Sequence, residues 1–178
     1  MRLVVVGGVA GGMSAAARAR RLDETAEIIV LDRGAHVSFA NCGLPYFVGG
    51  EIENERSLLV QTPASLKAAL DLDVRVRHDV TALDTASRTL TVQTEIGTEQ
   101  LHYDALILSP GALAVRPPLP GLDSPRVHTL RTVEDATTLR TIVTAGARRA
   151  VVLGGGLIGI EAAGALRAQG LETSVVEL

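Results

Sequence analysis

The chain has 178 residues, a formal net charge of −3 and 47% hydrophobic residues. This composition predicts a packed core rather than disorder, and without a basic stripe nothing indicates nucleic-acid binding. No apolar run reaches the roughly 18 residues that a membrane span needs, and the N-terminus predicts a strand rather than a signal peptide. A single cysteine, Cys42, excludes an internal disulfide in these residues and favours a reducing, cytoplasmic setting.

Hydrophobic runs, glycines and prolines divide the chain into short elements. In chain order they predict a strand at 2–8, a helix at 11–22, a strand at 26–32, a loop-rich stretch to Gly50, a helix at 62–72 that Thr62 caps, and a strand at 73–80. Next come short antiparallel strands within 82–103, a buried strand at 104–112, a connector rich in proline at 115–121 and a helix at 132–146.

The last segment, 148–178, repeats the strand, glycine turn, helix and strand of the opening segment, about 147 residues later. Such an internal repeat predicts two nucleotide-binding domains in an α/β fold with parallel strands. A doubly wound sheet normally has several more strands than the second unit contains. We therefore expect the chain to be truncated within the second nucleotide-binding unit of a longer protein.

The second glycine turn fits the G-x-G-x-x-G pattern at Gly154, Gly156 and Gly159. These glycines permit a tight turn, a close approach of backbone to a pyrophosphate and close packing of helix on strand. Glu177 ends the next strand, where a carboxylate accepts hydrogen bonds from a ribose and repels a 2′-phosphate. The turn predicts a dinucleotide site that favours NADH over NADPH, whereas the alternative is a packing turn without a ligand.

The first turn follows the pattern less closely. Asp32 supplies the acid after the second strand, but Val9 replaces the middle glycine, so the backbone has less room for a pyrophosphate. This turn also predicts a dinucleotide site, and its glycines alone leave the dinucleotide undecided. The glycines of this turn are Gly7, Gly8, Gly11 and Gly12.

The run from Val4 to Gly50, "VVVGGVAGGMSAAARARRLDETAEIIVLDRGAHVSFANCGLPYFVGG", resembles the N-terminus of the coenzyme A-disulfide reductases, and "YDALILSPGALAVRPPLPG" and "LRTVEDA" resemble their later segments. These enzymes are flavin-dependent pyridine nucleotide-disulfide oxidoreductases. The resemblance implies an FAD/NAD(P)-binding Rossmann-like fold in three layers, with a parallel sheet and an antiparallel β-meander. It implies the first part of an FAD-binding domain at 1–115, a connector and helix at 116–147, and the start of an NAD(P)-binding domain at 148–178.

The resemblance also implies the binding residues of both cofactors, FAD in the first unit and NADH or NADPH in the second. The implied FAD contacts are Gly7, Gly8, Gly11, Gly12, Asp32, Arg33, Asn41, Val80, Ser109, Gly111 and Arg131. The implied contacts of the nicotinamide cofactor are Gly154, Gly156, Gly159, Glu177 and, near the nicotinamide, Glu161.

The single cysteine separates this chain from relatives that use a cysteine pair. Single-cysteine members either form a mixed disulfide with coenzyme A or cycle through a sulfenic acid, as the NADH oxidases and peroxidases do. The sequence "SFANCGLPY", with Asn41 before Cys42 and Pro45 and Tyr46 after it, favours the disulfide or persulfide branch.

The residues around Cys42 are consistent with a reactive thiol. Pro45 suits the first turn of a short helix and Gly49 its end, so Cys42 is predicted at a helix N-terminus, where the dipole favours the thiolate. Ser38 and Asn41 are predicted to hydrogen-bond around the thiol, completing a catalytic group of Cys42, Asn41 and Ser38. Without the resemblance, an inert buried cysteine would be the simpler reading.

Three polar residues share one face of the first helix: Ser14, Arg18 and Arg21. Arginine suits phosphate recognition, and the resemblance implies that this face binds coenzyme A; a solvated basic face is the alternative. The four histidines show no metal-ligand spacing, so no metal site is predicted.

The predicted function is FAD-dependent reduction of coenzyme A disulfide or a persulfide by NAD(P)H, through Cys42 as the one redox-active cysteine. The alternatives are an NADH oxidase or peroxidase that uses a cysteine sulfenate, and an inactive nucleotide-binding fragment, because we expect the 178-residue chain alone not to turn over. The predicted partners are coenzyme A or another small thiol or disulfide, with no nucleic acid and no membrane. A full-length homodimer is expected.

Overall fold

The computed structural model describes residues 1–177, which form two compact units. The first unit comprises Met1–Phe39 and Leu59–Gly111, and the second comprises Ala40–Leu58 and residues 112–177. The domain bounds predicted at residues 115 and 147 stay predictions, because the units record compactness and not function.

A parallel sheet forms the centre of the first unit. Its strand order is β3-β2-β1-β7, so β1 lies between β2 and β7, and Val5 of β1 pairs with Val30 and Ile107 on its two sides. Runs of valine, isoleucine and leucine suit strands that are buried on both faces. The strands are β1 (Arg2–Val6), β2 (Glu27–Asp32), β3 (Asp73–Val76) and β7 (Ala105–Leu108).

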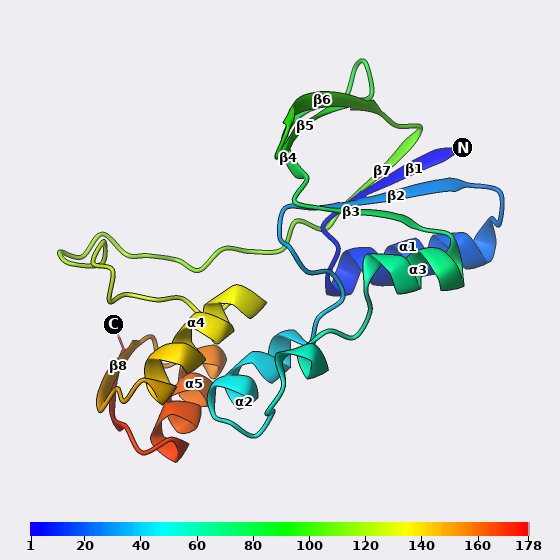
Figure 1. Ribbon diagram of the computed structural model, residues 1–178. Coiled ribbons are helices and arrows are strands. Elements are labelled where there is room, and N and C mark those ends of the chain that lie inside the picture. The colour runs from blue at the N-terminus through cyan, green and yellow to red at the C-terminus, as the bar shows by residue number, and fades with distance from the viewer. Residues whose placement is uncertain (178) are drawn as a thin grey trace. The chain divides into compact units, whose positions relative to one another are not determined.

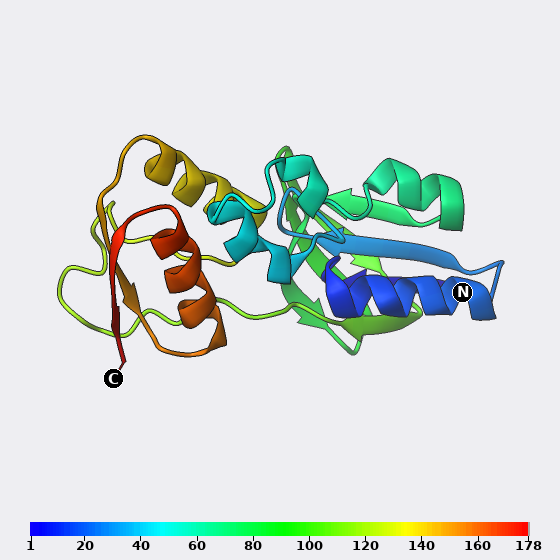
Figure 2. The ribbon, with the colours of Figure 1, turned by 90° about the horizontal axis from the view of Figure 1, so that it is seen from below.

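Helices cover one face of this sheet and an antiparallel meander covers the other (Figure 1). Alternate residues of β1 divide between the two cores: Leu3 and Val5 pack with the helices, while Val4 packs with the meander. Figure 2 shows the two helices along the same face of the sheet. The helices are α1 (Ala10–Leu22) and α3 (Pro63–Leu70), and the meander strands are β4 (Asp79–Asp84), β5 (Thr89–Thr94) and β6 (Gly97–His102). The predicted three-layer α/β fold, a parallel sheet with an antiparallel meander, is confirmed.

The prediction of one strand over residues 73–80 is wrong. Two strands occupy this segment, β3 in the parallel sheet and β4 in the meander. Between them Arg77 adopts a φ of 56°, its N–H donates to Gly34 O at 2.9 Å, and the N–H of His78 donates to Asp32 O at 2.9 Å. The alternation of residues continues through this turn, so the pattern alone does not reveal that the chain changes sheets.

Threonine side chains cap two helices, and the cap at Thr62 confirms the prediction. Thr62 caps α3 in a reciprocal capping box with Ser65, and Pro63 occupies its first turn. Thr132 caps α4 (Val133–Thr144) in the same way with Asp135. Each box satisfies backbone donors that the first turn of a helix leaves free.

The second unit contains a parallel pair of strands and three helices. The pair is β8 (Arg149–Leu153) and β9 (Glu172–Val176), connected through α5 (Leu157–Ala168). The short helix α2 (Leu44–Val48) packs against α4 and α5, and the 3₁₀ turns η1 (Asn41–Gly43) and η2 (Glu55–Leu58) flank it. Among residues 1–177, no helix combines the length and the apolar character that crossing a membrane requires.

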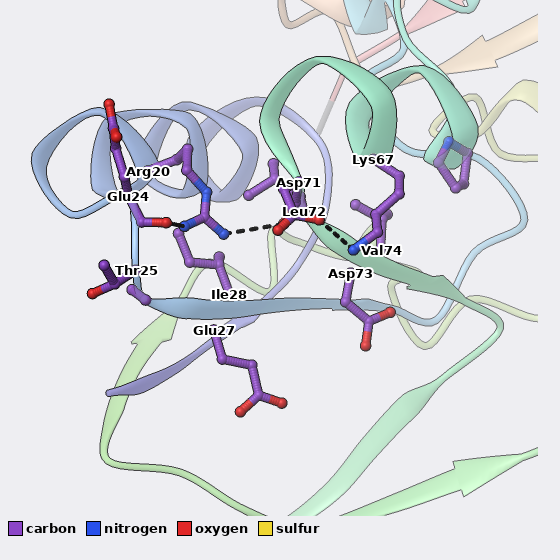
Figure 3. A pocket seen from close by; sticks show the side chains of 12 residues that line it. Arg20, Glu24, Thr25, Glu27, Ile28, Lys67, Asp71, Leu72, Asp73 and Val74 are labelled. Carbon is purple, nitrogen blue, oxygen red and sulfur yellow. Dashed lines mark hydrogen bonds and ion pairs between the residues drawn. The ribbon is translucent and has the colours of Figure 1, made fainter.

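A polar hollow lies in the first unit between the ends of α1 and α3 and the starts of β2 and β3 (Figure 3). Arg20 dominates it: the guanidinium donates to Leu70 O at 2.9 Å, to Glu24 O at 2.7 Å and to Asp71 O at 3.0 Å. These carbonyls lie in the last turn of α3 or just after α1 and α3, so one cation stabilises the ends of both helices. Lys67 pairs with Asp71 on the far side of the hollow.

Replacing Arg20 with methionine should therefore destabilise the first unit. The carbonyls lose a charged donor, and we expect the free energy of unfolding to fall by about 1–3 kcal/mol. Urea unfolding followed by circular dichroism measures the change. Arg18→Met on the same helix, where the side chain is exposed, should change it by less than about 0.5 kcal/mol. Equal effects of the two substitutions would show that Arg20 has no special role.

Candidate functional site

The first glycine turn joins the carboxyl ends of three neighbouring strands. It follows β1, and the Gly7 N–H donates to Leu31 O at 2.8 Å. The carboxylate of Asp32, which ends β2, accepts from Gly8 N at 2.6 Å and from Gly34 N at 2.7 Å. Ser109, which follows β7, donates its N–H to Val6 O at 2.7 Å. The structure thus brings the turn, the acid and Ser109 together at one edge of the sheet, where ligands of open α/β sheets bind.

Glycine is sterically required at two positions of this turn. Gly7 has a φ of +100°, and a Cβ there would overlap the Ser109 carbonyl. A Cβ at Gly12 would overlap the Gly7 carbonyl, so α1 begins in direct contact with the turn. The first turn of α1 has no side-chain cap, because Val9 occupies the N-cap position. Its backbone donors are available for an anion, as at other helix N-termini that bind phosphate.

The other predicted FAD residues of the first unit lie around this edge or on the meander. Arg33 is exposed directly after Asp32, and Gly111, with a φ of 70°, follows Ser109. Val80 pairs with Val92 in the meander, beside an irregularity in the β4–β5 register. Their roles stay predictions.

Ser38 has an unusual backbone conformation. Its φ is 47°, a region that non-glycine residues seldom adopt. The Ser38 N–H donates to Gly8 O at 2.8 Å, and its carbonyl accepts from Val60 N at 3.0 Å. These bonds fix the backbone where the chain leaves the first turn toward Cys42. The structure gives Ser38 a structural task, and its predicted catalytic role stays a prediction.

The second glycine turn repeats two hydrogen bonds and one close contact of the first. Gly154 has a φ of +109° and donates its N–H to Val176 O at 2.8 Å, as Gly7 does to Leu31 O. The N–H of Gly155 donates to the Glu177 carboxylate, the counterpart of the bond between Gly8 and Asp32. A Cβ at Gly159 would overlap the Gly154 carbonyl, as one at Gly12 would overlap Gly7. The repeat seen in the sequence is therefore a repeat of geometry.

The structure adds Gly155 to the predicted residues of the second turn. The sequence pattern gave no role to Gly155, although its N–H orients the acid at the strand end. The signal was the matching position of Gly8 in the first turn. Gly156 is the N-cap of α5, and Glu161 is exposed on that helix.

Cys42 lies in the second unit, in the 3₁₀ turn that leads directly into α2. Its side chain is exposed, and so is that of Tyr46 one turn later, whereas Phe47 and Val48 are buried. The buried-thiol reading fails because the helix buries its other face and leaves the thiol on the outside. An exposed thiol can be approached by a disulfide.

Asn41, the residue before Cys42, has an unsatisfied polar atom. Its Oδ1 is buried without a hydrogen-bond partner among residues 1–177. Buried polar atoms in folded proteins are usually paired, so this oxygen is a candidate contact for a bound group. Arg131, also in the second unit, donates Nε to Ala112 O at 3.2 Å.

The predicted basic face of α1 is present as a surface. Ser14, Arg18 and Arg21 are all exposed on that helix. Arg20, which points elsewhere, is occupied by backbone carbonyls. The geometry leaves the first three side chains available to a ligand, and their role stays a prediction.

The conformation of Gly7 generates a stability prediction. Gly7→Ala adds a Cβ at a positive φ and against the Ser109 carbonyl, so we expect the free energy of unfolding to fall by about 2–3 kcal/mol. Gly11→Ala in the same turn is the matched control, because its Cβ would meet only the Ser109 hydroxyl, at 2.7 Å, which can rotate away. Urea unfolding of both variants tests this, and an equal or smaller loss for Gly7→Ala would contradict the steric argument.

Known proteins are similar to this chain over nearly its whole length. The coenzyme A disulfide reductase of Staphylococcus haemolyticus is 38% identical over 178 residues, which are 98% of this chain and 40% of that protein. The chain therefore spans about two fifths of the length of this curated relative.

Solved structures are also similar to this chain over nearly its whole length. A reduced CoADR-RHD protein of Bacillus anthracis is 44% identical with a TM-score of 0.96, covering 99% of this chain and 32% of that one. An NAD-dependent persulfide reductase from A. fulgidus is 36% identical with a TM-score of 0.95, covering 98% and 34%. A water-forming NADH oxidase from Lactobacillus brevis, bound to NADH, is 28% identical with a TM-score of 0.93, covering 99% and 39%. The family model for pyridine nucleotide-disulphide oxidoreductases matches residues 1–178, so the chain belongs to that family.

Proposed function

We propose that the gene product containing this chain is an FAD-dependent oxidoreductase that uses NAD(P)H to reduce coenzyme A disulfide, or a related persulfide, through Cys42. The observation that carries the proposal is an exposed thiol without a partner cysteine, in a chain with two matching nucleotide turns. An internal redox disulfide needs two cysteines, and these 178 residues hold one, so in this proposal the thiol reacts with an external sulfur. Similarity to a coenzyme A disulfide reductase and to a persulfide reductase supports this choice.

The first turn would hold FAD. Its bare backbone at Gly7, Gly11 and Gly12 leaves the space that a Cβ would fill, and the uncapped start of α1 offers N–H donors to the pyrophosphate. The Asp32 carboxylate accepts two backbone bonds and keeps lone pairs for ribose hydroxyls. We assign further FAD contacts to Gly8, Arg33, Asn41, Val80, Ser109, Gly111 and Arg131. When bound, FAD supplies two-electron transfer between the nicotinamide and a disulfide.

The second turn would hold the nicotinamide cofactor. Gly154, Gly156 and Gly159 would receive the pyrophosphate at the start of α5, and Glu177, held by Gly155, would accept from the adenosine ribose. The charge of Glu177 opposes a 2′-phosphate, which favours NADH. We assign Glu161, exposed on α5, to the neighbourhood of the nicotinamide.

Cys42 would carry the sulfur chemistry. Its thiolate attacks one sulfur of coenzyme A disulfide, the S–S bond breaks, and one coenzyme A thiolate leaves with a proton from solvent. The product is a mixed disulfide between Cys42 and coenzyme A. Two electrons, ultimately from NAD(P)H, then cleave that bond and regenerate the Cys42 thiolate with a second coenzyme A thiol. We assign Asn41 and Ser38 to support the thiol.

Coenzyme A would bind along the exposed face of α1. Arg18 and Arg21 offer guanidinium groups for its phosphates, and Ser14 offers a hydroxyl one turn earlier. We also infer a cytoplasmic setting, since a single free thiol suits a reducing compartment. We also propose that the complete gene product forms a homodimer.

The reactive thiol can be tested directly in the complete gene product. Cys42→Ser removes the nucleophile, so we expect the oxidation of NADH that depends on coenzyme A disulfide to fall by more than about 1,000-fold. Absorbance at the NADH band measures the rate, with coenzyme A disulfide, persulfide, peroxide and oxygen as separate acceptors.

NADH-dependent reduction of an artificial dye is the control, because it needs no cysteine and should persist in Cys42→Ser. Retained disulfide reduction in the variant would refute the mechanism. A wild-type protein that prefers peroxide or oxygen would instead indicate the sulfenate chemistry, and one that oxidises no NADH would refute the enzyme assignment.

The preference for NADH can be tested at Glu177. Glu177→Gln keeps an acceptor for the Gly155 N–H and removes the charge, so kcat/KM for NADPH relative to NADH should rise by about tenfold. Glu172 is an exposed carboxylate at the start of β9, the strand that leads to Glu177, and Glu172→Gln should leave that ratio unchanged. An unchanged ratio in Glu177→Gln would mean that the carboxylate does not set the preference.

A further inference from the structure

The helix that follows Cys42 is too short to be stable by itself. The helix α2 has five residues, whereas isolated helices shorter than about 12 residues are marginal in water. Its place must therefore come from tertiary contacts. The turn η2 packs near its start, and α4 and α5 contribute hydrogen bonds at its C-terminal end, the end opposite Cys42.

Arg140 of α4 makes the first of these contacts. Its Nη1 donates to Phe47 O at 2.5 Å and to Ile52 O at 2.7 Å. The guanidinium also lies over the Phe47 ring, 4.6 Å from the ring centroid. A cation at carbonyls that end a helix is favoured by charge and by hydrogen bonding, and stacking on the ring adds to both. One side chain thus fixes the last turn of α2 and the loop after it.

The end of α5 makes the second contact. Gln169, the C-cap residue of α5, donates Nε2 to Gly49 O at 2.5 Å. A Cβ at Gly49 would lie 3.1 Å from Cβ of Ala165, so the two helices touch through backbone at this point. The φ of Gly49 is −72°, which any residue can adopt, so the glycine is required by the close approach and not by conformation.

We propose that Arg140 and Gln169 are positioning residues for Cys42. They hold the C-terminal end of the continuous helical segment 41–48, and the thiol lies at the other end of that segment. At 1.5 Å per residue the lever is roughly 9 Å long, so a tilt of about 6° moves the thiol by about 1 Å. A misplacement of that size can cost on the order of 100-fold in rate. The inference rests on the proposed function, because Cys42 is taken as the reacting group.

The first measurement is kinetic, on the flavin-loaded complete gene product. Arg140→Met should lower kcat for coenzyme A disulfide by about 10- to 100-fold, while KM for NADH stays within about twofold. Arg140→Lys should recover most of the rate, because an ammonium can also donate to both carbonyls. Gln169→Glu has nearly the same shape but no donor for Gly49 O, so it should lower kcat in the same way. Arg148→Met, at an exposed arginine before β8, is the matched control and should match wild type.

The second measurement needs no acceptor. Hydrogen–deuterium exchange with mass spectrometry reports protection of the amides of Gly49, Gly50 and Ile52, which are hydrogen-bonded within this segment. In Arg140→Met their exchange should be about tenfold faster than in wild type, with peptides of β1 and β2 unchanged. A general loss of stability would speed exchange in all of these peptides.

The outcomes separate this inference from the proposed function. Faster local exchange with reduced kcat, both restored by Arg140→Lys, supports positioning. Unchanged local exchange, or faster exchange with full kcat, overturns it. A wild-type protein that is inactive with coenzyme A disulfide refutes the proposed substrate, and the exchange experiment then still decides whether Arg140 holds the segment that carries Cys42.

Discussion

The direct contact between a helix and the carbonyl of a glycine turn is the constraint on which both nucleotide units depend. At Gly12 and Gly159 a single methyl group would occupy the position of a carbonyl oxygen. Because the helix can lie that close, its first-turn donors point over the strand ends, and the next strand brings an acid to the same place. The bonds of Gly8 to Asp32 and of Gly155 to Glu177 follow from this packing in both units.

Much of the fold could be predicted from the sequence, because residue types and their spacing indicate the turns and the helix starts. The capping residues Thr62 and Thr132 act within a few residues and cap their helices. The glycine turns and their strand-end acids recur at matching positions of one strand–turn–helix–strand pattern, although their bonds span more than 20 residues. The change of sheet at Arg77 could not be predicted, because bonds to Gly34 and Asp32 create it across more than 40 residues. Polar and apolar residues alternate on both sides of that turn, so the pattern fits one continuous strand as well as two.

The candidate site was less predictable, for a physical reason. The sequence predicts a reactive thiol at Cys42 only through a family resemblance, since composition alone favours a buried cysteine. Its exposure depends on which face of α2 is covered, and α4 and α5, about 90 to 130 residues later in the chain, cover it. Arg140 and Gln169 gave no signal in the sequence for the same reason, because a long polar side chain on an amphipathic helix is usually solvated.

The packing of α2 also determines which unit carries the thiol. Residues 40–58 follow the first nucleotide turn in sequence, yet they belong to the compact unit that contains the second turn. Their apolar side chains, Phe47 and Val48 above all, are buried there, and Glu55 accepts a bond from Thr137 at 2.7 Å. Cys42 and the second glycine turn therefore share one packed body. At the C-terminal end of α5, Gln169 donates to Gly49 O and so links this helix to the short helix beside Cys42.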